Sequence, residues 1–298
     1  MNNAPANVIN RLSLEYNLTE HCNLSCYGCD HASPLLPTKF AVVTEFTRDL
    51  EALAPVFHSN QLRIVGGEPL LHPDLLDFLR EGRRIAIADS IVLYTNGVLL
   101  HEMPAELWGL IDELHISAYP GVRRRLDDAE CSRLCDKHGV KLDIEHFPAF
   151  TKTLINKRIR DKRLVEAIFL DCKTALECNT VYDGRFYKCS VAPFMGTRLA
   201  LQGINFEDLT SDGVSLHDNA ALYEELDRYL NDRTPLAACS FCLGSSGQVI
   251  DHRQLNRRGC ASWQTENSQP DIDAVRAHLL GTPWYVRGIR KLTRRPRS

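Results

Sequence analysis

The sequence predicts an α/β fold in which a partial βα-repeating barrel precedes a smaller, cysteine-rich domain. Short β-rich runs alternate with helical patterns up to about residue 150. Beyond that point the alternation is hard to follow, and six further cysteines appear at positions 172, 178, 189, 239, 242 and 260. We therefore expect a first domain over residues 1–163, a second over 164–262 and a helical, basic C-terminal tail over 263–298.

Five candidate strands support the barrel. Each is a short run rich in β-branched and other apolar residues. Strands that alternate with helical segments are typical of a parallel sheet. The candidate strands are Leu12 to Tyr16, Gln61 to Val65, Ile91 to Thr95, Leu114 to Ala118 and Val140 to His146.

The segments after the first two strands have helical periodicity. A second helix is expected to begin at Pro73 and to stop at Gly82, because proline favours a first helical position and glycine a helix end. The first helix follows Thr44, a candidate N-cap. Its apolar residues recur at helical spacing and are Phe46, Leu50, Leu53 and Phe57.

A third helix is expected from about Leu126 to Lys137, with a stop at Gly139. Its Cys131 and Cys135 share one face with Leu134. Free cysteine on the core-facing side of a helix acts as a small hydrophobe. We therefore expect these two thiols to be core residues, with a ligand or redox role as the alternative.

The pattern after residue 150 is less regular. A polar, basic stretch from Thr151 to Arg163 is typical of a connector, and Ala220 to Leu230 is amphipathic and predicts a short helix. Asp183 and Gly184 lie between two short β-rich runs and predict a hairpin turn. The segment from Trp284 carries six basic residues and no acid. We expect a solvated tail there, with contact to an anionic partner as the alternative.

The composition places limits on function. The 298 residues are 44% hydrophobic and 24% charged, as in a globular chain, and the net charge of −3 gives no field typical of a nucleic-acid binder. No run approaches the roughly 18 apolar residues of a membrane span, and the N-terminus lacks a basic region followed by an apolar run. We therefore expect a cytoplasmic protein without nucleic-acid or membrane partners.

The 11 cysteines are an odd number and fall in clusters, which argues against a disulfide framework and for metal ligands in a reducing compartment. Cys22, Cys26 and Cys29 directly follow the first strand. In βα barrels the loops at this end of the strands carry the chemistry. A closed zinc site needs a fourth ligand, which His21 or His31 can supply. A [4Fe-4S] cluster held by three thiolates keeps one iron open for a substrate or cofactor.

This C-x3-C-x2-C spacing, followed by Gly66-Gly67-Glu68-Pro69 after the second strand, resembles the radical S-adenosylmethionine superfamily. The resemblance implies a partial (β/α)6 TIM-like barrel and a [4Fe-4S] cluster on the three cysteines. It also implies that S-adenosylmethionine binds the open iron and is cleaved to methionine and a 5′-deoxyadenosyl radical. A flavodoxin or ferredoxin is the expected electron donor.

The resemblance also implies which residues contact S-adenosylmethionine. Gly66 and Gly67, with Pro69 after them, bring backbone close to the methionine end, and Glu68 attracts its ammonium. Asn96 and Ser117 end the next two strands and are expected to contact the methionine and ribose parts, with ordinary turn residues as the alternative. The position before the third cysteine, often aromatic in the family, is Gly28, so Tyr27 or His31 takes the adenine side.

The later cysteines are similar to the auxiliary-cluster extensions called SPASM and twitch domains. Cys178 and Cys189 flank the predicted hairpin, and Cys239 and Cys242 form a C-x2-C pair, so the resemblance implies one auxiliary [4Fe-4S] cluster on these four. Zinc suits four thiolates equally well. Cys172 and Cys260 are possible replacements, and one cluster, the twitch arrangement, is favoured.

The expected activity is hydrogen abstraction from a small polar metabolite, such as a sugar, aminocyclitol or nucleoside. The outcome would be dehydrogenation, dehydration, epimerisation or decarboxylation in natural-product biosynthesis, antibiotic biosynthesis included. Tyr119 and His146, near strand ends, are candidates to orient or deprotonate the substrate, with packed or surface residues as the alternative. We see no N-terminal extension for leader-peptide recognition, so we place a peptide maturase second among the enzymes. The alternative from another class is a zinc-stabilised binding module without redox chemistry.

Overall fold

The computed structural model describes residues 8–204 and 212–281. Its larger sheet contains β1 (Ile9–Asn17), β2 (Phe57–Val65), β3 (Ala88–Thr95), β4 (Glu113–Ala118), β5 (Lys141–His146), β7 (Asn179–Tyr182), β8 (Arg185–Tyr187) and β9 (Val214–Ser215). The strand order is β5-β4-β3-β2-β1-β7-β8-β9. Neighbours from β5 to β7 pair in parallel, and β8 and β9 add antiparallel edges. The α/β prediction is confirmed.

The five predicted strands are confirmed as β1 to β5. Four of them begin before the expected residue. In β2, for example, the polar stretch from His58 to Asn60 is already strand, and His58 pairs with Asn10 of β1. Polar residues at a strand start give no hydrophobic signal in the sequence. They are nevertheless strand, because backbone hydrogen bonds to the neighbouring strand hold them in the ladder.

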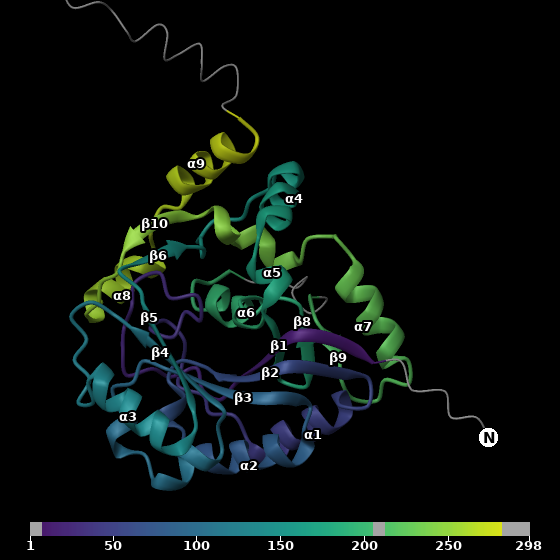
Figure 1. Ribbon diagram of the computed structural model, residues 1–298. Coiled ribbons are helices and arrows are strands. Elements are labelled where there is room, and N and C mark those ends of the chain that lie inside the picture. Colours follow the sequence, from purple (N-terminus) through teal and green to yellow (C-terminus); the bar gives the residue numbers. More distant parts are fainter. Residues whose placement is uncertain (1–7, 205–211, 282–298) are drawn as a thin grey trace, which may run out of the picture.

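Three helices cover one side of the parallel strands, α1 (Val43–Leu53), α2 (Leu75–Ile85) and α3 (Asp128–His138), as Figure 1 shows. Their apolar side chains form the main core with residues of β1 to β4. Phe46 and Phe78 meet edge to face in this core, with ring centroids 5.2 Å apart. The helical periodicity of the sequence therefore marks the face that packs on the sheet.

Several predicted helix ends differ from the structure; α2, for example, begins at Leu75 rather than at Pro73. Val42, rather than Thr44, is the N-cap of α1, and no side chain caps this end. Gly82 is not a stop, since α2 continues to Ile85 and ends at Ala86, which has a left-handed φ of 54°. A Cβ on Gly82 would lie 3.1 Å from Leu62 of β2. This glycine therefore serves the close packing of helix on sheet.

The predicted features of α3 are confirmed. Asp127 and Glu130 form a capping box at its start, and Gly139 ends it with a φ of 69°. Cys131 and Cys135 are each only 1% exposed and belong to the main core. The two thiols are therefore core residues.

Much of the rest of the chain lies on the other side of the parallel strands in Figure 1. β6 (Ala149–Lys152) pairs with β10 (Gln248–Asp251) in a separate antiparallel sheet. The helices are α4 (Lys162–Asp171), α5 (Thr174–Glu177), α6 (Ala192–Ala200), α7 (Leu222–Asn231), α8 (Arg257–Gln264) and α9 (Gln269–Leu279). Short 3-10 turns are η1 (Pro69–Leu71), η2 (Leu100–Glu102), η3 (Ala105–Gly109), η5 (Ala237–Phe241) and η6 (Gly244–Ser246).

The predicted hairpin and the helix at 220–230 are confirmed as β7, β8 and α7. Asp183 and Gly184 both have positive φ, 47° and 68°, as a tight turn of this kind requires. The expected connector, Thr151 to Arg163, includes the end of β6 and the start of α4. The basic tail from Trp284 lies outside the described residues.

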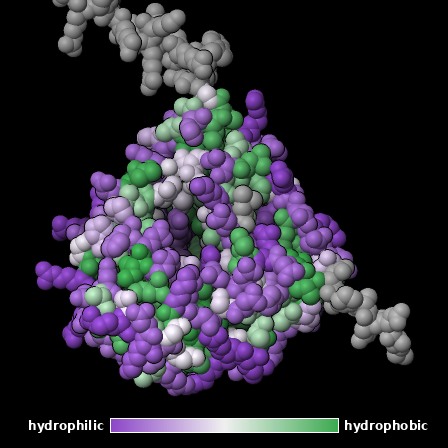
Figure 2. Space-filling model, in the orientation of Figure 1, coloured by the Kyte–Doolittle hydropathy of each residue, from purple (hydrophilic) through white to green (hydrophobic). Residues whose placement is uncertain are grey.

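Contacts cross both of the predicted domain boundaries, which stay predictions. The β6 and β10 pair joins residues 149–152 to residues 248–251. Ile272 and Val275 of α9 share a small core with Leu164 and Ile168 of α4. The face shown in Figure 2 is mainly hydrophilic, with scattered hydrophobic groups and a hollow near its middle. Across residues 8–204 and 212–281, none of the helices combines the length and apolar character of a membrane span.

Candidate active site

A cavity of about 490 Å³ opens at the carboxyl ends of the first four strands. Its wall contains the last residues of β2 and β3, Val65 and Thr95, and Ser117 near the end of β4. All three cysteines of the first group lie in the same wall. Parallel strands bring their carboxyl ends to one edge, which explains why residues far apart in sequence meet here. The other predicted site residues on this wall are Gly28, Gly66, Gly67, Asn96, Tyr119 and Cys178.

The three cysteines are placed in one loop after β1. Burial raises the pKa of Cys22 to about 12 and that of Cys29 to about 12, and neighbouring negative charges add to both shifts. Ionised thiols at this site therefore need positive charge close by. An iron–sulfur cluster supplies that charge to thiolate ligands, so the chemistry of the three donors fits such a group.

Gly66 and Gly67 join the β2 loop to the cysteine loop. The backbone N–H of Gly67 donates to Thr19 O at 2.6 Å, and that of Glu68 donates to His21 O at 2.9 Å. A Cβ on Gly67 would lie 2.2 Å from His21 O, and one on Gly66 would lie 2.6 Å from Thr19 O. The glycine pair thus lets two backbones touch beside the cavity.

Glu68 is placed differently from the expectation that it meets the methionine ammonium. Its side chain is 0% exposed, and the cavity wall described above does not include it or Pro69. The carboxylate accepts hydrogen bonds from Leu70 N, Thr95 Oγ1 and Asn96 N. Burial raises the pKa of Glu68 to about 7. These contacts tie the loop after β2 to the end of β3, which is a structural role.

Asn96 lies where the sequence places it, at the end of β3 and on the cavity wall. Its backbone N–H donates to Glu68 Oε2 at 2.8 Å, and its amide Nδ2 donates to Asn23 Oδ1 at 2.7 Å. The same amide is 3.8 Å from Cys22 Sγ. Ser117 also lines the cavity but is only partly buried.

The aromatic side of the cavity differs from the predicted one. Tyr27 points away, since its hydroxyl donates to Glu266 at 2.9 Å and its ring packs on Trp263. His31 lines the cavity, and burial lowers the pKa of its imidazole to about 4. The larger aromatic surface comes from Tyr119, Phe147 and Phe150, whose rings contact one another.

The two candidate catalytic residues have different surroundings. Tyr119 lines the cavity, and its ring stacks on His252 with centroids 4.8 Å apart. His146 has a side chain that is 70% exposed and lies 3.9 Å from Asp128. The expectation that His146 contacts substrate therefore does not fit its position at the surface, because β5 ends with this side chain in solvent.

A second group of cysteines surrounds a small, apolar pocket of about 20 Å³. Cys172 follows α4, Cys189 follows β8, and Cys239 and Cys242 lie in and directly after η5. All four line the pocket. Burial first, and then the neighbouring thiols, raise the pKa of Cys189, Cys239 and Cys242. Four soft thiols in an apolar pocket are a donor set that fits an iron–sulfur cluster or zinc.

Cys178 departs from the expected group, because it lines the larger cavity instead of the small pocket. It lies near Glu15, which also lines the cavity and is mostly buried. Burial raises the pKa of Glu15 to about 7, and the charge of Arg63 opposes this shift. Cys260 lies in α8 and packs near Trp263 and Cys29. Sequence spacing alone carries no signal that separates Cys172 from Cys178.

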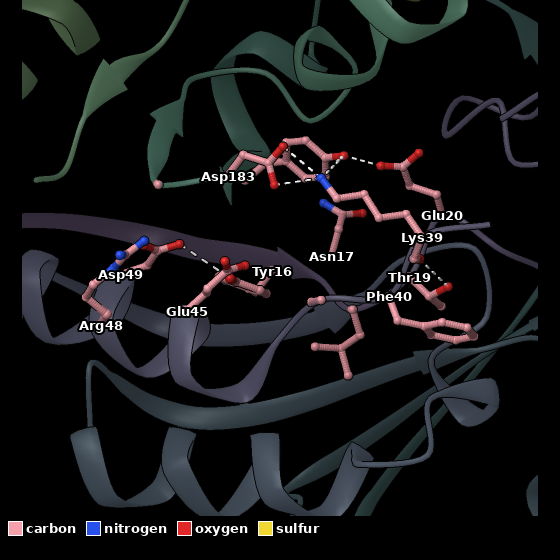
Figure 3. A pocket seen from close by; sticks show the side chains of 14 residues that line it. Tyr16, Asn17, Thr19, Glu20, Lys39, Phe40, Glu45, Arg48, Asp49 and Asp183 are labelled. Atoms are coloured by element: carbon pink, nitrogen blue, oxygen red, sulfur yellow. Dashed lines mark hydrogen bonds and ion pairs between the residues drawn. The ribbon is translucent and has the colours of Figure 1, made fainter. Parts of the chain in front are cut away.

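A separate polar pocket of about 220 Å³ lies on the outer side of the end of β1, between α1 and the turn after β7. Figure 3 shows Lys39 reaching Asp183, with Nζ 2.7 Å from Oδ1, and Tyr16 donating to Asp49 at 3.4 Å. Lys39 and Asp183 thus form an ion pair within this pocket. None of the predicted site residues is among the described residues that line it.

Side chains of the types that ligate metals do not form a metal-ion site within the described residues. In residues 8–204 and 212–281, no three His, Cys, Asp or Glu side chains come together as a metal ion would require. What the structure shows is the presence of three thiols on the wall of one cavity and four on another.

Comparison with known proteins finds matches to part of the chain. Residues 16–119 match the model of the radical SAM superfamily. The chain is 30% identical over 151 residues to a GTP 3′,8-cyclase of Rhodopirellula baltica, which covers 44% of this chain and 41% of that protein. It is 33% identical over 96 residues to molybdenum cofactor biosynthesis protein 1 of Bos taurus, covering 32% of this chain and 15% of that protein. The matches thus span less than half of these relatives.

A solved structure, BtrN in complex with AdoMet and 2-DOIA, superposes on 81% of this chain and 96% of its own with a TM-score of 0.47 and 18% identity. These values are too low to support an inference about chemistry.

Residues 16–119 therefore carry a radical SAM domain. Enzymes of this superfamily use a [4Fe-4S] cluster and S-adenosylmethionine and need a reductant.

Proposed function

We propose that this enzyme abstracts a hydrogen atom from a small polar metabolite of the sugar, aminocyclitol or nucleoside class, in natural-product biosynthesis. The observation that carries the proposal is the single cavity of about 490 Å³. Its wall contains the three cysteines, Gly66, Gly67 and Asn96, and also Glu15 and Cys178. A site of this size suits a cofactor and a small substrate together.

In this proposal Cys22, Cys26 and Cys29 hold the [4Fe-4S] cluster. When bound, the cluster and S-adenosylmethionine supply a 5′-deoxyadenosyl radical by reductive cleavage of the sulfonium. Asn96, Ser117 and the backbone at Gly66 and Gly67 hold the cofactor. The aromatic surface of Tyr119, Phe147 and Phe150 gives its adenine an apolar face.

Glu15 and Cys178 are proposed to face the substrate. A mostly buried carboxyl whose pKa is raised to about 7 by burial exchanges a proton with a substrate hydroxyl or amine near neutral pH. In an epimerisation, the S–H bond of Cys178 would break to return a hydrogen atom to the substrate carbon. The sulfur radical left behind would take up one electron from the external one-electron donor and one proton from Glu15.

The names of the curated relatives support a polar substrate. Five of the matched proteins are named GTP 3′,8-cyclase, so they act on a nucleotide. A nucleoside or nucleotide therefore lies within the proposed class. Residues 177–190 lie outside the matched family region of 16–119. The residues proposed to face the substrate can therefore differ from those of these relatives.

The small pocket is proposed to hold one auxiliary [4Fe-4S] cluster on Cys172, Cys189, Cys239 and Cys242, as in a twitch domain. Its apolar lining and its four thiols support a resident cluster at this place. In a substrate oxidation, this cluster would accept the electron left on the substrate. A flavodoxin or ferredoxin is proposed as the external donor.

The test begins with anaerobic reconstitution and analysis of iron, sulfide and zinc. Two clusters give about eight iron per chain, and the reduced protein then converts S-adenosylmethionine to 5′-deoxyadenosine. Cys26→Ala should lower that conversion by more than about 100-fold, beyond the 10–100-fold typical of outer-shell changes. Cys260→Ser is the matched control and should retain activity, because this thiol lies outside both cavities.

Deuterium transfer identifies the substrate class. Deuterated sugars, aminocyclitols, nucleosides and short peptides are incubated with the reduced enzyme, and 5′-deoxyadenosine is examined by mass spectrometry. Deuterium from a small polar compound supports the proposal. Transfer from peptides alone, or a zinc-dominated protein without cofactor cleavage, contradicts it.

A further inference from the structure

We infer that Gln254 donates a hydrogen bond to the sulfur of Cys26 and thereby sets the reduction potential of the first cluster. This inference rests on the proposed function, in which Cys26 is a cluster ligand. Gln254 Nε2 lies 3.1 Å from Cys26 Sγ, across 228 residues of sequence. Gln254 also lies far outside residues 16–119, the region that the family model matches.

Backbone pairing on both sides of Cys26 fixes the two chains in register. Tyr27 N donates to Arg253 O at 3.0 Å, and Leu255 N donates to Ser25 O at 2.7 Å. Between these two bonds, Cys26 and Gln254 form an antiparallel bridge. Gln254 is therefore placed opposite Cys26 by the backbone, before any side-chain contact is considered.

The direction of the Gln254 amide is fixed by a second contact. Its Oε1 accepts a hydrogen bond from Ser25 N at 2.7 Å. A backbone N–H can only donate, so the oxygen of the amide must face Ser25 and the nitrogen must face the sulfur. The same Nε2 lies 3.2 Å from His252 Nε2, so one N–H of the amide reaches the sulfur while the other faces the imidazole.

Neighbouring contacts hold the segment 252–255 against the cysteine loop. The Arg253 guanidinium lies over the Tyr27 ring at 4.2 Å, and the His252 ring stacks on Tyr119. On its N-terminal side the segment continues from β10, which is paired with β6. A donor held at this many points does not need to be reoriented when the cluster gains an electron.

The physical effect on the cluster has a definite sign. Reduction adds negative charge to the iron and sulfur atoms, and an N–H that points at a ligand sulfur stabilises that charge. Hydrogen bonds to the sulfurs are one of the factors that set cluster potentials. Gln254 therefore raises the potential of the first cluster and makes its reduction easier, which is the step on which cofactor cleavage depends.

The experiment is a redox titration of the reconstituted enzyme followed by electron paramagnetic resonance, using the signal that changes when S-adenosylmethionine is added. Gln254→Leu should lower the potential by an amount equal to about a tenfold drop in the ratio of reduced to oxidised cluster, or 59 mV for one electron. Gln248→Leu, the same change at an exposed position of β10, is the control and should leave the potential unchanged.

A second variant covers the possibility that Gln254→Leu loosens the loop. Gln254→Glu keeps the oxygen that accepts from Ser25 but turns a negative oxygen toward the sulfur, so its potential should fall at least as far. A variant that loads iron fully and keeps the wild-type potential overturns the inference. A different result would overturn the proposed function: wild-type protein whose electron paramagnetic resonance signal does not change when S-adenosylmethionine is added.

Discussion

The two cysteine groups differ in how they are built and in what surrounds them. Cys22, Cys26 and Cys29 come from one loop and lie on a cavity of about 490 Å³. Cys172, Cys189, Cys239 and Cys242 come from three separate places and line a pocket of about 20 Å³. The first group keeps space beside it for other molecules. The second group is closed by apolar side chains. In the proposed function, the first site must admit a cofactor and a substrate, whereas the second only holds a cluster. The open cavity and the small apolar pocket fit these different tasks.

The first prediction breaks the open site at its glycines and has the largest expected effect. Gly67→Ala puts a Cβ 2.2 Å from a backbone oxygen of His21, which no rotamer change relieves. We expect loss of the first cluster and of S-adenosylmethionine cleavage. Iron analysis and 5′-deoxyadenosine formation measure this, with the iron of the second group retained.

Gly109→Ala is the matched control, because a Cβ there would meet nothing within 4 Å. It should load iron and cleave the cofactor like the wild type. A Gly67→Ala protein with full iron and normal cleavage would show that the contact between the two loops is unimportant for the open site.

The second prediction separates the two groups through Cys172 and Cys178. Cys172→Ser should lower the iron content from about eight to about four per chain, because it removes one of four thiolates from the closed pocket. Cys178→Ser should keep about eight iron, since this thiol lines the larger cavity instead of the small pocket.

Both variants are reconstituted side by side and examined by iron analysis and Mössbauer spectroscopy. The reverse result, with iron lost from Cys178→Ser and kept in Cys172→Ser, would restore the ligand set that spacing alone suggested.

The third prediction has the smallest expected effect. It concerns Glu68, which ties the loop after β2 to the end of β3. Burial raises the pKa of Glu68 from 4.5 to about 7, so the folded protein favours the neutral carboxyl. Its contribution to stability is complete below pH 4.5, falls as the pH rises and is lost above pH 7. The total change is roughly 3 kcal/mol.

Thermal unfolding of the wild type and Glu68→Gln at several pH values measures this contribution. The variant lacks the titrating group, so its Tm relative to the wild type should rise between pH 5 and pH 8. Glu224→Gln, at an exposed position of α7, should show no such trend. An equal trend in the two variants would mean that Glu68 titrates normally.

Local patterns were enough to predict much of this protein. The five parallel strands, the capping of α3 and the hairpin at Asp183 and Gly184 follow from periodicity and turn chemistry, which act over a few residues. The cysteine loop and the glycine pair were predicted as parts of one site because parallel strands end at a common edge. The structure places both on the wall of one cavity.

Contacts between distant segments decided the rest. Glu68 faces Thr95 and Asn96, Tyr27 faces Glu266, and Gly82 serves packing against Leu62 rather than a helix end. The side chains of Glu68 and Tyr27 each have two reasonable directions, and their neighbours in the fold select one. For Gly82, the nearby strand decides why a side chain is not tolerated. No local pattern contains those neighbours.

The sequence by itself determined that this chain has an α/β fold with a three-cysteine loop and a GGEP segment, because these features depend on residue type and short spacing. Only the tertiary structure decided that Cys172 rather than Cys178 joins the second group and that Gln254 meets Cys26. The physical reason is that a thiol or an amide reaches only a few ångströms, so its partners are set by how the whole chain folds.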